Sequence, residues 1–212
     1  MSQDPSLEQA LEYINQKEYK LAEAKLRRSL DFQTNCNTEI KFRLAFCLEM
    51  QGRHEEAESL YIQVSTSKGP PEIVGDSLFR IAWMAMTLKK DHIKAIEYYQ
   101  KAAEILIECP DSQKLYKDSI YWLALSHEVL GQIINALEIY ERIAMDDFWF
   151  WDVCHRKVIC LDKIGRFEDA LMCCREFEDH YRKSEDAGRA IELYPVIKRI
   201  KSQLEKLFLD SE

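Results

Sequence analysis

A small residue recurs along almost the whole chain, and this repeat limits the folds that the sequence can adopt. It returns at intervals of 35, 38, 41 and 34 residues, at Ala22, Ala57, Ala95, Ala136 and Ala170. The pattern is most complete in residues 118–144, where it predicts two antiparallel helices joined at Gly131. A pair of helices this short cannot bury its apolar face alone. The repetition therefore predicts a stack of helix pairs.

Two further positions keep the same register. Five residues before each alanine stands a turn residue, in chain order Lys17, Gly52, Lys90, Gly131 and Gly165. Four residues after each alanine stands a packing residue, in chain order Leu26, Tyr61, Tyr99, Tyr140 and Cys174. Counting back from the turns assigns one slot of the first helices to Gln9-Ala10, Leu44-Ala45, Ala82-Trp83, Leu123-Ala124 and Lys157-Val158. Trp83 stands out, because it occupies a position where a small residue is expected.

These positions resemble the signature of the tetratricopeptide repeat (TPR), whose period is about 34 residues. The resemblance implies an all-α protein, a right-handed α-solenoid of five TPR-like helix pairs plus a C-terminal capping helix. We expect a single array over residues 1–212, with repeats near 5–30, 38–66, 71–109, 112–145 and 148–183 and the capping helix in 184–212. That helix carries an apolar stripe at Leu193, Ile197, Ile200, Leu204 and Leu207, with Pro195 as a candidate interruption.

Composition and motifs exclude several functions. The net charge of −8 gives no electrostatic reason to bind nucleic acid or anionic lipid. We find no apolar run long enough to span a bilayer and no signal peptide. We therefore expect a cytoplasmic location and no membrane insertion. The sequence has no phosphate-binding loop and none of the common hydrolase motifs, which predicts a protein that is not an enzyme and needs no cofactor.

Seven cysteines are scattered over the predicted helices, which favours reduced thiols over disulfides. One group could instead hold structural zinc, namely Cys154, Cys160, Cys173 and Cys174 with His155 and His180. Its spacing lacks the paired Cys-x2-Cys motif of most zinc sites. We therefore expect no metal, and buried thiols that pack as small apolar side chains.

The resemblance implies a concave groove lined by the first helices. Two positions on each of these helices would face it, which gives as partner-binding residues Phe42, Phe46, Arg80, Met84, Tyr121, Leu125, His155 and Ile159, with Leu7 and Leu11 in the first repeat. One row, Leu11, Phe46, Met84, Leu125 and Ile159, is apolar throughout. A small error of register would place this row in the core between helices instead.

Acidic residues flank this row on both sides. The predicted acidic rim consists of Glu39, Glu49, Asp118, Glu128, Asp152 and Asp162, with neutral Ser77 and Thr87 at these positions in the third repeat. An apolar floor between acidic rims suits an amphipathic, basic segment of another protein. The leading interpretation is therefore a non-catalytic protein-protein interaction adaptor or scaffold.

Two alternatives remain open. The aromatic run Phe148-Trp149-Phe150-Trp151 and the C-terminal helix could build a homodimer, which would make the chain a self-associating structural or assembly protein. At least one of these four rings should lie at the surface, because they cannot all point inward from one helix. A ligand-sensing regulator is the second alternative, and it would need a closed pocket.

Overall fold

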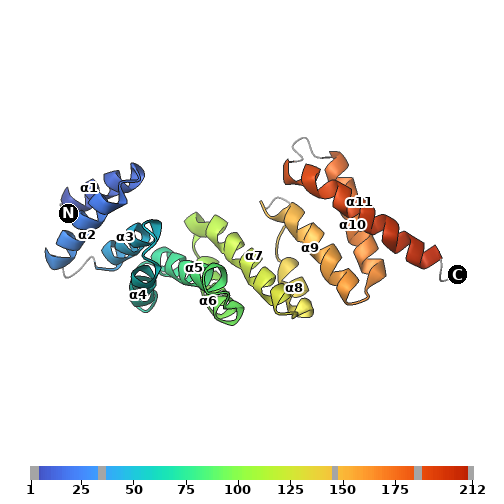
Figure 1. Ribbon diagram of the computed structural model, residues 1–212, viewed down its shortest axis with the longest axis horizontal. Coiled ribbons are helices and arrows are strands. Elements are labelled where there is room, and N and C mark those ends of the chain that lie inside the picture. The colour runs from blue at the N-terminus through green and yellow to red at the C-terminus, as the bar shows by residue number, and fades with distance from the viewer. Residues whose placement is uncertain (1–4, 33–36, 145–147, 184–187, 210–212) are drawn as a thin grey trace. The chain divides into compact units, whose positions relative to one another are not determined.

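The computed structural model describes residues 5–32, 37–144, 148–183 and 188–209 (Figure 1). Every regular element in these ranges is a helix. The chain divides into two compact units, Met1–Ser119 and Ile120–Glu212, with the division inside one helix, α7. Whether the chain forms the single array expected over residues 1–212 stays a prediction.

The first unit contains three helix pairs and the start of a fourth. The helices are α1 (Pro5–Asn15), α2 (Tyr19–Phe32), α3 (Asn37–Met50), α4 (His54–Ser65), α5 (Pro71–Thr87), α6 (His92–Leu106), the short 3-10 helix η1 (Pro110–Ser112) and α7 (Gln113–Val129), of which the first residues belong here. The second unit contains the rest of α7, α8 (Ile133–Tyr140), α9 (Phe150–Lys163), α10 (Phe167–Lys183) and α11 (Gly188–Leu209).

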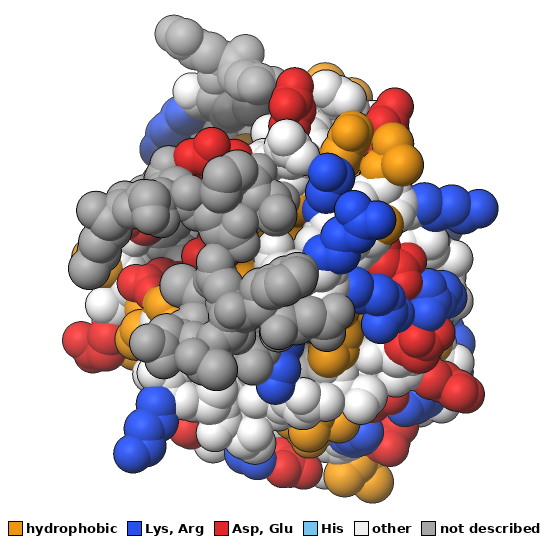
Figure 2. Space-filling model, turned by 90° about the vertical axis from the view of Figure 1, so that its left-hand side faces the viewer, with side chains coloured by type: hydrophobic (Ala, Val, Ile, Leu, Met, Phe, Trp, Pro, Cys, Tyr) orange, Lys and Arg blue, Asp and Glu red, His pale blue; other side chains and the backbone are white. Residues whose placement is uncertain are grey.

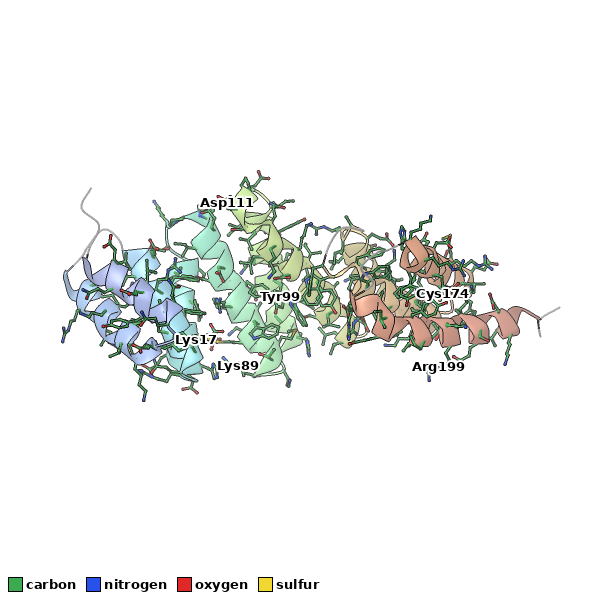
Figure 3. The ribbon with its side chains drawn as sticks, turned by 90° about the horizontal axis from the view of Figure 1, so that it is seen from above. Lys17, Lys89, Tyr99, Asp111, Cys174 and Arg199 are labelled. Atoms are coloured by element: carbon green, nitrogen blue, oxygen red, sulfur yellow. The ribbon has the colours of Figure 1, made fainter. Side chains whose placement is uncertain are left out.

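The turns within the pairs lie where the sequence predicts them. All five predicted turn residues have a positive φ: 61° at Lys17, 78° at Gly52, 56° at Lys90, 74° at Gly131 and 75° at Gly165. Such a left-handed residue ends a helix and reverses the chain, so the next helix can pack back along the first. Figure 3 shows two residues of these turns, Lys17 and Lys89, at the same edge of the first unit and Asp111 at the opposite edge.

The second helices pack as predicted. The five recurring alanines are completely buried, and so are the residues four positions later, including Tyr61, Tyr99 and Tyr140. A methyl group at the alanine position lets the two helices of a pair approach closely. The tyrosine ring fills the space one turn further on.

The third pair differs from the others by one residue in its turn. In the other pairs the amide that closes the turn bonds to a carbonyl five residues earlier, as from Arg53 to Leu48 (2.9 Å). In the third pair Asp91 bonds to Ala85, six residues earlier (2.9 Å). Counting back from α6 therefore gives positions on α5 whose residue numbers are too high by one.

This shift corrects the predicted register of α5. Ile81 and Ala82, both completely buried, take the slot that Leu44-Ala45 and Leu123-Ala124 take elsewhere. The prediction that Trp83 replaces a small residue is wrong, because Ala82 stands there.

The C-terminal helix α11 covers the last pair, packing against α9 and α10. Leu193, Ile197 and Leu204 of its apolar stripe are buried, whereas Leu207 is exposed. The helix continues through Pro195, which lies on its exposed side. The stripe is thus largely used inside the protein.

The first pair turns polar residues outward. Gln9, which occupies the leucine slot there, is exposed, as expected for the end of an array. On the face shown in Figure 2, Lys and Arg side chains lie among Asp and Glu side chains, and hydrophobic side chains form small separate groups. In the described part of the chain no helix is long and apolar enough to cross a membrane.

Candidate functional site

Three aromatic pairs repeat between the first and second helices of successive pairs. Their ring centroids lie 5.8 Å apart for Phe42 and Tyr61, 5.5 Å for Phe79 and Tyr99, and 6.4 Å for Tyr121 and Tyr140. Phe42 and Tyr121, expected in the open groove, are instead buried in these pairs. Phe79, not Arg80, is their equivalent in α5, which agrees with the register shift.

A second set of positions stays partly open to solvent. These floor positions directly follow the buried small residue of each first helix, and they hold Leu11, Phe46 and Trp83 in the first unit and Leu125 and Ile159 in the second. All five side chains are half-buried. Met84, predicted here, is only 2 % exposed, so that prediction is wrong. The extra turn residue rotates Met84 into the core and Trp83 onto the floor.

Around Phe46 the floor is built from groups of different chemistry. The ring of Tyr19, from α2, meets Phe46 edge to face with centroids 6.0 Å apart. The guanidinium of Arg80, from α5, lies over the Phe46 ring at 4.9 Å from its centroid. A cation over an aromatic face is an attractive arrangement. Phe46 is therefore held in place while part of it remains exposed.

Two carboxylates predicted on the rim belong to internal hydrogen-bond networks. The hydroxyl of Tyr61 donates to Glu49 Oε2 (2.7 Å), and Arg80 Nη1 donates to the same oxygen (3.0 Å). In the second unit Tyr140 donates to Glu128 Oε2 (3.0 Å) and Arg156 Nη1 donates to Glu128 Oε1 (3.1 Å).

Each network joins three helices. It comprises a carboxylate at the end of one first helix, the tyrosine of the following second helix and an arginine of the next first helix. The side chains of Glu49 and Glu128 are only 10 % and 7 % exposed, so neither is a free rim charge. Burial, the largest cause, raises the pKa of both Tyr61 and Tyr140, and the neighbouring carboxylate raises it further. Both phenols therefore stay protonated and donate to the carboxylates.

No such network is found in the third pair within the described part of the chain. Tyr99 is as buried as Tyr61, but its hydroxyl has no hydrogen-bond partner among the residues that the structure describes. Once the register of α5 is corrected, the position of Glu49 corresponds to Met86, which carries no carboxylate. A buried hydroxyl without a partner destabilises a fold.

The other acidic residues recur at one position of successive first helices. Six residues before each buried small residue stand Glu39, Asp76, Asp118 and Asp152, and all four are half-buried. Asp76 takes the place assigned to neutral Ser77. Glu39 pairs with Arg43 (3.4 Å), Asp76 with Arg80 (3.0 Å) and Asp152 with Arg189 (3.3 Å). Burial raises the pKa of Asp76, against the opposing effect of Arg80. Asp162 is exposed.

His155 is the remaining predicted groove residue, and it is half-buried on α9. Burial lowers its pKa, and the positive charge of Arg156 lowers it further. The folded protein therefore favours the neutral imidazole.

Two rings of the aromatic run pack on other aromatic rings, and a third is exposed to solvent. Trp149 stacks on Tyr121 with ring centroids 4.0 Å apart and planes within 5° of parallel. Trp151 packs edge to face on Phe177 (5.1 Å). Phe148 is 77 % exposed, which confirms the expectation that one of the four rings lies at the surface.

The cysteines of the last pair are free thiols. Burial raises the pKa of Cys154, Cys160 and Cys174 to about 12, which keeps them protonated and poorly nucleophilic near neutral pH. Among the described residues no group of three or more His, Cys, Asp or Glu side chains could hold a metal ion.

Comparisons with known proteins find similarity of structure alone. No family model matches the sequence, and no curated protein matches it. Among solved structures, YrrB, described as a TPR protein with an unusual peptide-binding site, is 14% identical, with 81% of this chain and 82% of that chain covered and a TM-score of 0.63. MamA is 16% identical, with 87% and 100% covered and a TM-score of 0.63. The apo form of RapI is 16% identical, with 97% of this chain but 63% of RapI covered and a TM-score of 0.68. These likenesses agree with the left-handed turns, the buried alanines and the aromatic pairs: the protein has the helical-repeat fold of the TPR proteins.

Proposed function

We propose that this protein is a non-catalytic interaction module that binds a segment of another protein on the first-helix face of its N-terminal unit. The main supporting observation is that Phe46 and Trp83 occupy the same floor position of α3 and α5 and that both stay partly exposed to solvent. Aromatic side chains that are partly open to solvent are typical anchors of protein interfaces. The fold also supports the proposal, because YrrB has the same architecture and is described as having a peptide-binding site.

The charges near the floor define the partner's chemistry. Glu39, Glu49 and Asp76 supply three carboxylates, and Arg43 and Arg80 supply two guanidinium groups, a surplus of one negative charge. The surplus is smaller than the acidic rim predicted from sequence, because Arg43 and Arg80 pair with these carboxylates. An amphipathic segment with apolar anchors and a modest positive charge fits this face.

Self-association is the alternative, and Phe148 is the observation that favours it. The α11 stripe contributes little to it, because Leu193, Ile197 and Leu204 are already buried within the chain. Light scattering over a range of concentrations separates the two functions. A constant monomer would exclude self-association, and a dimer lost on Phe148→Ser would favour it.

The proposal is tested with two matched double variants of the full chain. Phe46→Ala/Trp83→Ala removes the floor, whereas Ile62→Ala/Ile93→Ala removes two exposed side chains from the second helices α4 and α6. Each variant is used to capture proteins from an extract of the source cells. A partner held by the native chain and the control variant, but lost by the floor variant, supports the proposal. Equal capture by all three proteins would refute it, once circular dichroism shows that all are folded.

A further inference from the structure

The outer side of α11, in the second unit, is a surface that contains none of the floor residues. The buried apolar stripe of this helix packs against α9 and α10, so its opposite side faces solvent. On that side, spacings of four, three and four residues align four exposed side chains, namely Ile191, Pro195, Lys198 and Ser202. Arg199 is also exposed and projects outward from the helix in Figure 3. We call these five residues the outer stripe. It is apolar in its N-terminal half and basic in its C-terminal half.

The two cations of the outer stripe make no ion pair within the described part of the chain. In residues 194–203 the only other charged side chain is Lys201, and it is bound to Glu178 of α10 (2.6 Å). The nearest carboxylates on α11, Glu192 and Glu205, are each six residues away from the nearer cation. The C-terminal half of the stripe therefore presents two uncompensated positive charges.

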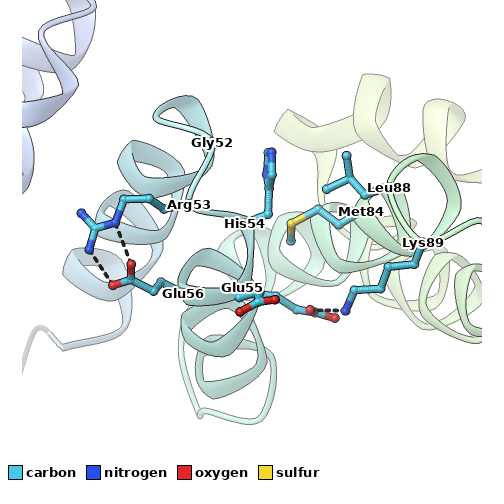
Figure 4. A pocket seen from close by; sticks show the side chains of 9 residues that line it. Gly52, Arg53, His54, Glu55, Glu56, Met84, Leu88 and Lys89 are labelled. Carbon is cyan, nitrogen blue, oxygen red and sulfur yellow. Dashed lines mark hydrogen bonds and ion pairs between the residues drawn. The ribbon is translucent and has the colours of Figure 1, made fainter.

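Other exposed basic side chains already have partners. Around the cleft of about 460 Å³ beside α4 in the first unit, Arg53 donates to both carboxylate oxygens of Glu56, at 2.7 and 2.6 Å (Figure 4). At the same cleft Lys89 pairs with Glu58. Such charges offer little to another molecule, because a new ion pair would have to replace an existing one. The two cations of the outer stripe can pair without that loss.

The dimensions of the outer stripe favour a protein partner over a membrane or a nucleic acid. A helix that lies in a membrane interface buries a broad apolar face, and the broad apolar face of α11 is already packed inside the unit. Double-stranded DNA carries a charge about every 1.7 Å along its axis, and it would meet two cations on a chain whose net charge is −8. A protein segment with a few carboxylates beside apolar side chains matches both halves of the stripe.

We propose that the outer stripe docks an acidic amphipathic helix of a partner protein, which runs antiparallel to α11. Its apolar side chains pack on Ile191 and Pro195, and two carboxylates near its N-terminus pair with Lys198 and Arg199. The direction follows from the helix macrodipole, because acidic residues stabilise the first turns of a helix and the cations lie in the C-terminal half of the stripe. This partner is opposite in charge to the one proposed for the floor, so the two surfaces select different segments.

The test uses a synthetic peptide, acetyl-Ser-Glu-Ala-Gln-Glu-Glu-Ala-Gln-Leu-Ala-Gln-Ala-Leu-Ala-Gln-amide, added to the full chain labelled with nitrogen-15. Amide resonances of residues 189–203 should shift as peptide is added. Lys198→Gln/Arg199→Gln should raise the Kd about two- to thirtyfold, the effect expected for the loss of two exposed ion pairs. Lys68→Gln/Lys114→Gln removes two exposed lysines of the first unit and is the matched control, which should leave the Kd unchanged. A peptide with Lys in place of each Glu should not bind.

Other outcomes would overturn the proposal. One is the absence of shifts in residues 189–203. Another is equal weakening by the stripe variant and the matched control, which would mean that net charge alone governs binding. A third is loss of binding in the floor variant Phe46→Ala/Trp83→Ala, which would assign the peptide to the floor. The last is that vesicles of phosphatidylserine and phosphatidylcholine shift the resonances of residues 189–203 and the peptide does not, because the stripe would then bind a lipid surface.

Discussion

Replacing each of the three buried tyrosines of the second helices, Tyr61, Tyr99 and Tyr140, by phenylalanine should change stability in opposite directions at equivalent positions. The change removes one hydroxyl and keeps the ring. In Tyr61→Phe and Tyr140→Phe it removes a hydrogen bond to a nearly buried carboxylate, 2.7 Å long in the first case and 3.0 Å in the second. Hydrogen bonds to charged groups contribute about 1.5–3 kcal/mol, so each variant should lower the free energy of unfolding by about that amount.

Tyr99→Phe should behave differently, because the Tyr99 hydroxyl is buried with no hydrogen-bond partner among the described residues. Its removal breaks no bond and relieves a desolvation penalty of about 1–3 kcal/mol, so the free energy of unfolding should stay the same or rise. The three substitutions are chemically identical and sit in the same slot of three successive pairs. Their differences therefore isolate the hydrogen bond from the packing of the ring.

The assay is urea unfolding followed by circular dichroism, with the midpoint and the slope compared for the native chain and each variant. Glu49→Gln combined with Tyr61→Phe completes a double-mutant cycle, which should show a coupling of more than about 0.5 kcal/mol. A loss of stability in Tyr99→Phe as large as in Tyr61→Phe would refute the reasoning. It would mean that the tyrosine hydroxyls stabilise the fold through contacts other than their hydrogen bonds to the carboxylates.

Three further predictions follow from the backbone, the last helix and one histidine. Lys17→Gly and Lys90→Gly should each raise the free energy of unfolding by up to about 1 kcal/mol, because the φ angles of 61° and 56° strain any side chain, and Gly131→Ala should lower it in the same urea assay. Deleting residues 188–212 should lower it by several kcal/mol, since the contacts of three large buried apolar side chains and of buried Ala190 are lost, and an unchanged melting temperature would contradict this. Because the pKa of His155 is lowered in the folded state, the unfolded chain takes up a proton more readily, and stability should fall as the pH drops below about 6.5. His155→Asn should reduce that fall between about pH 7.5 and about pH 5.5, and an identical pH profile would contradict the assignment.

The sequence predicted the helix pairs well, because their determinants are local. A residue that tolerates a left-handed turn, a small residue five positions on and a ring after it are read directly from the chain, and all five sets have the expected conformation or burial. Lys17 and Lys90 show that the turn, and not glycine itself, is the determinant.

The floor was predicted less well, because one extra residue in a turn shifts every position counted back from that turn by one residue, which is about 100° around the helix. Counting back from the turn of the third pair selects Met84 instead of Trp83, because that turn holds the extra residue. The sequence did contain the necessary signal. Phe79 matches the aromatic residues Phe42 and Tyr121, and Ile81-Ala82 matches Leu44-Ala45.

The role of Glu49 and Glu128 could not be read from one helix at a time. Each carboxylate is bound by groups from two other helices, so its burial depends on tertiary packing. The recurrent spacing of 12 residues between Glu49 and Tyr61, and between Glu128 and Tyr140, was the only sequence trace of this arrangement.

Site-specific photocrosslinking tests most directly whether the first-helix face is where a partner binds. A benzoylphenylalanine placed at Trp83 should crosslink to the captured partner, and the same group at Ile93, an exposed position on α6, should not. Crosslinking at Ile93 but not at Trp83 would contradict the account, because the partner would then bind the second helices and the floor would have no part in binding.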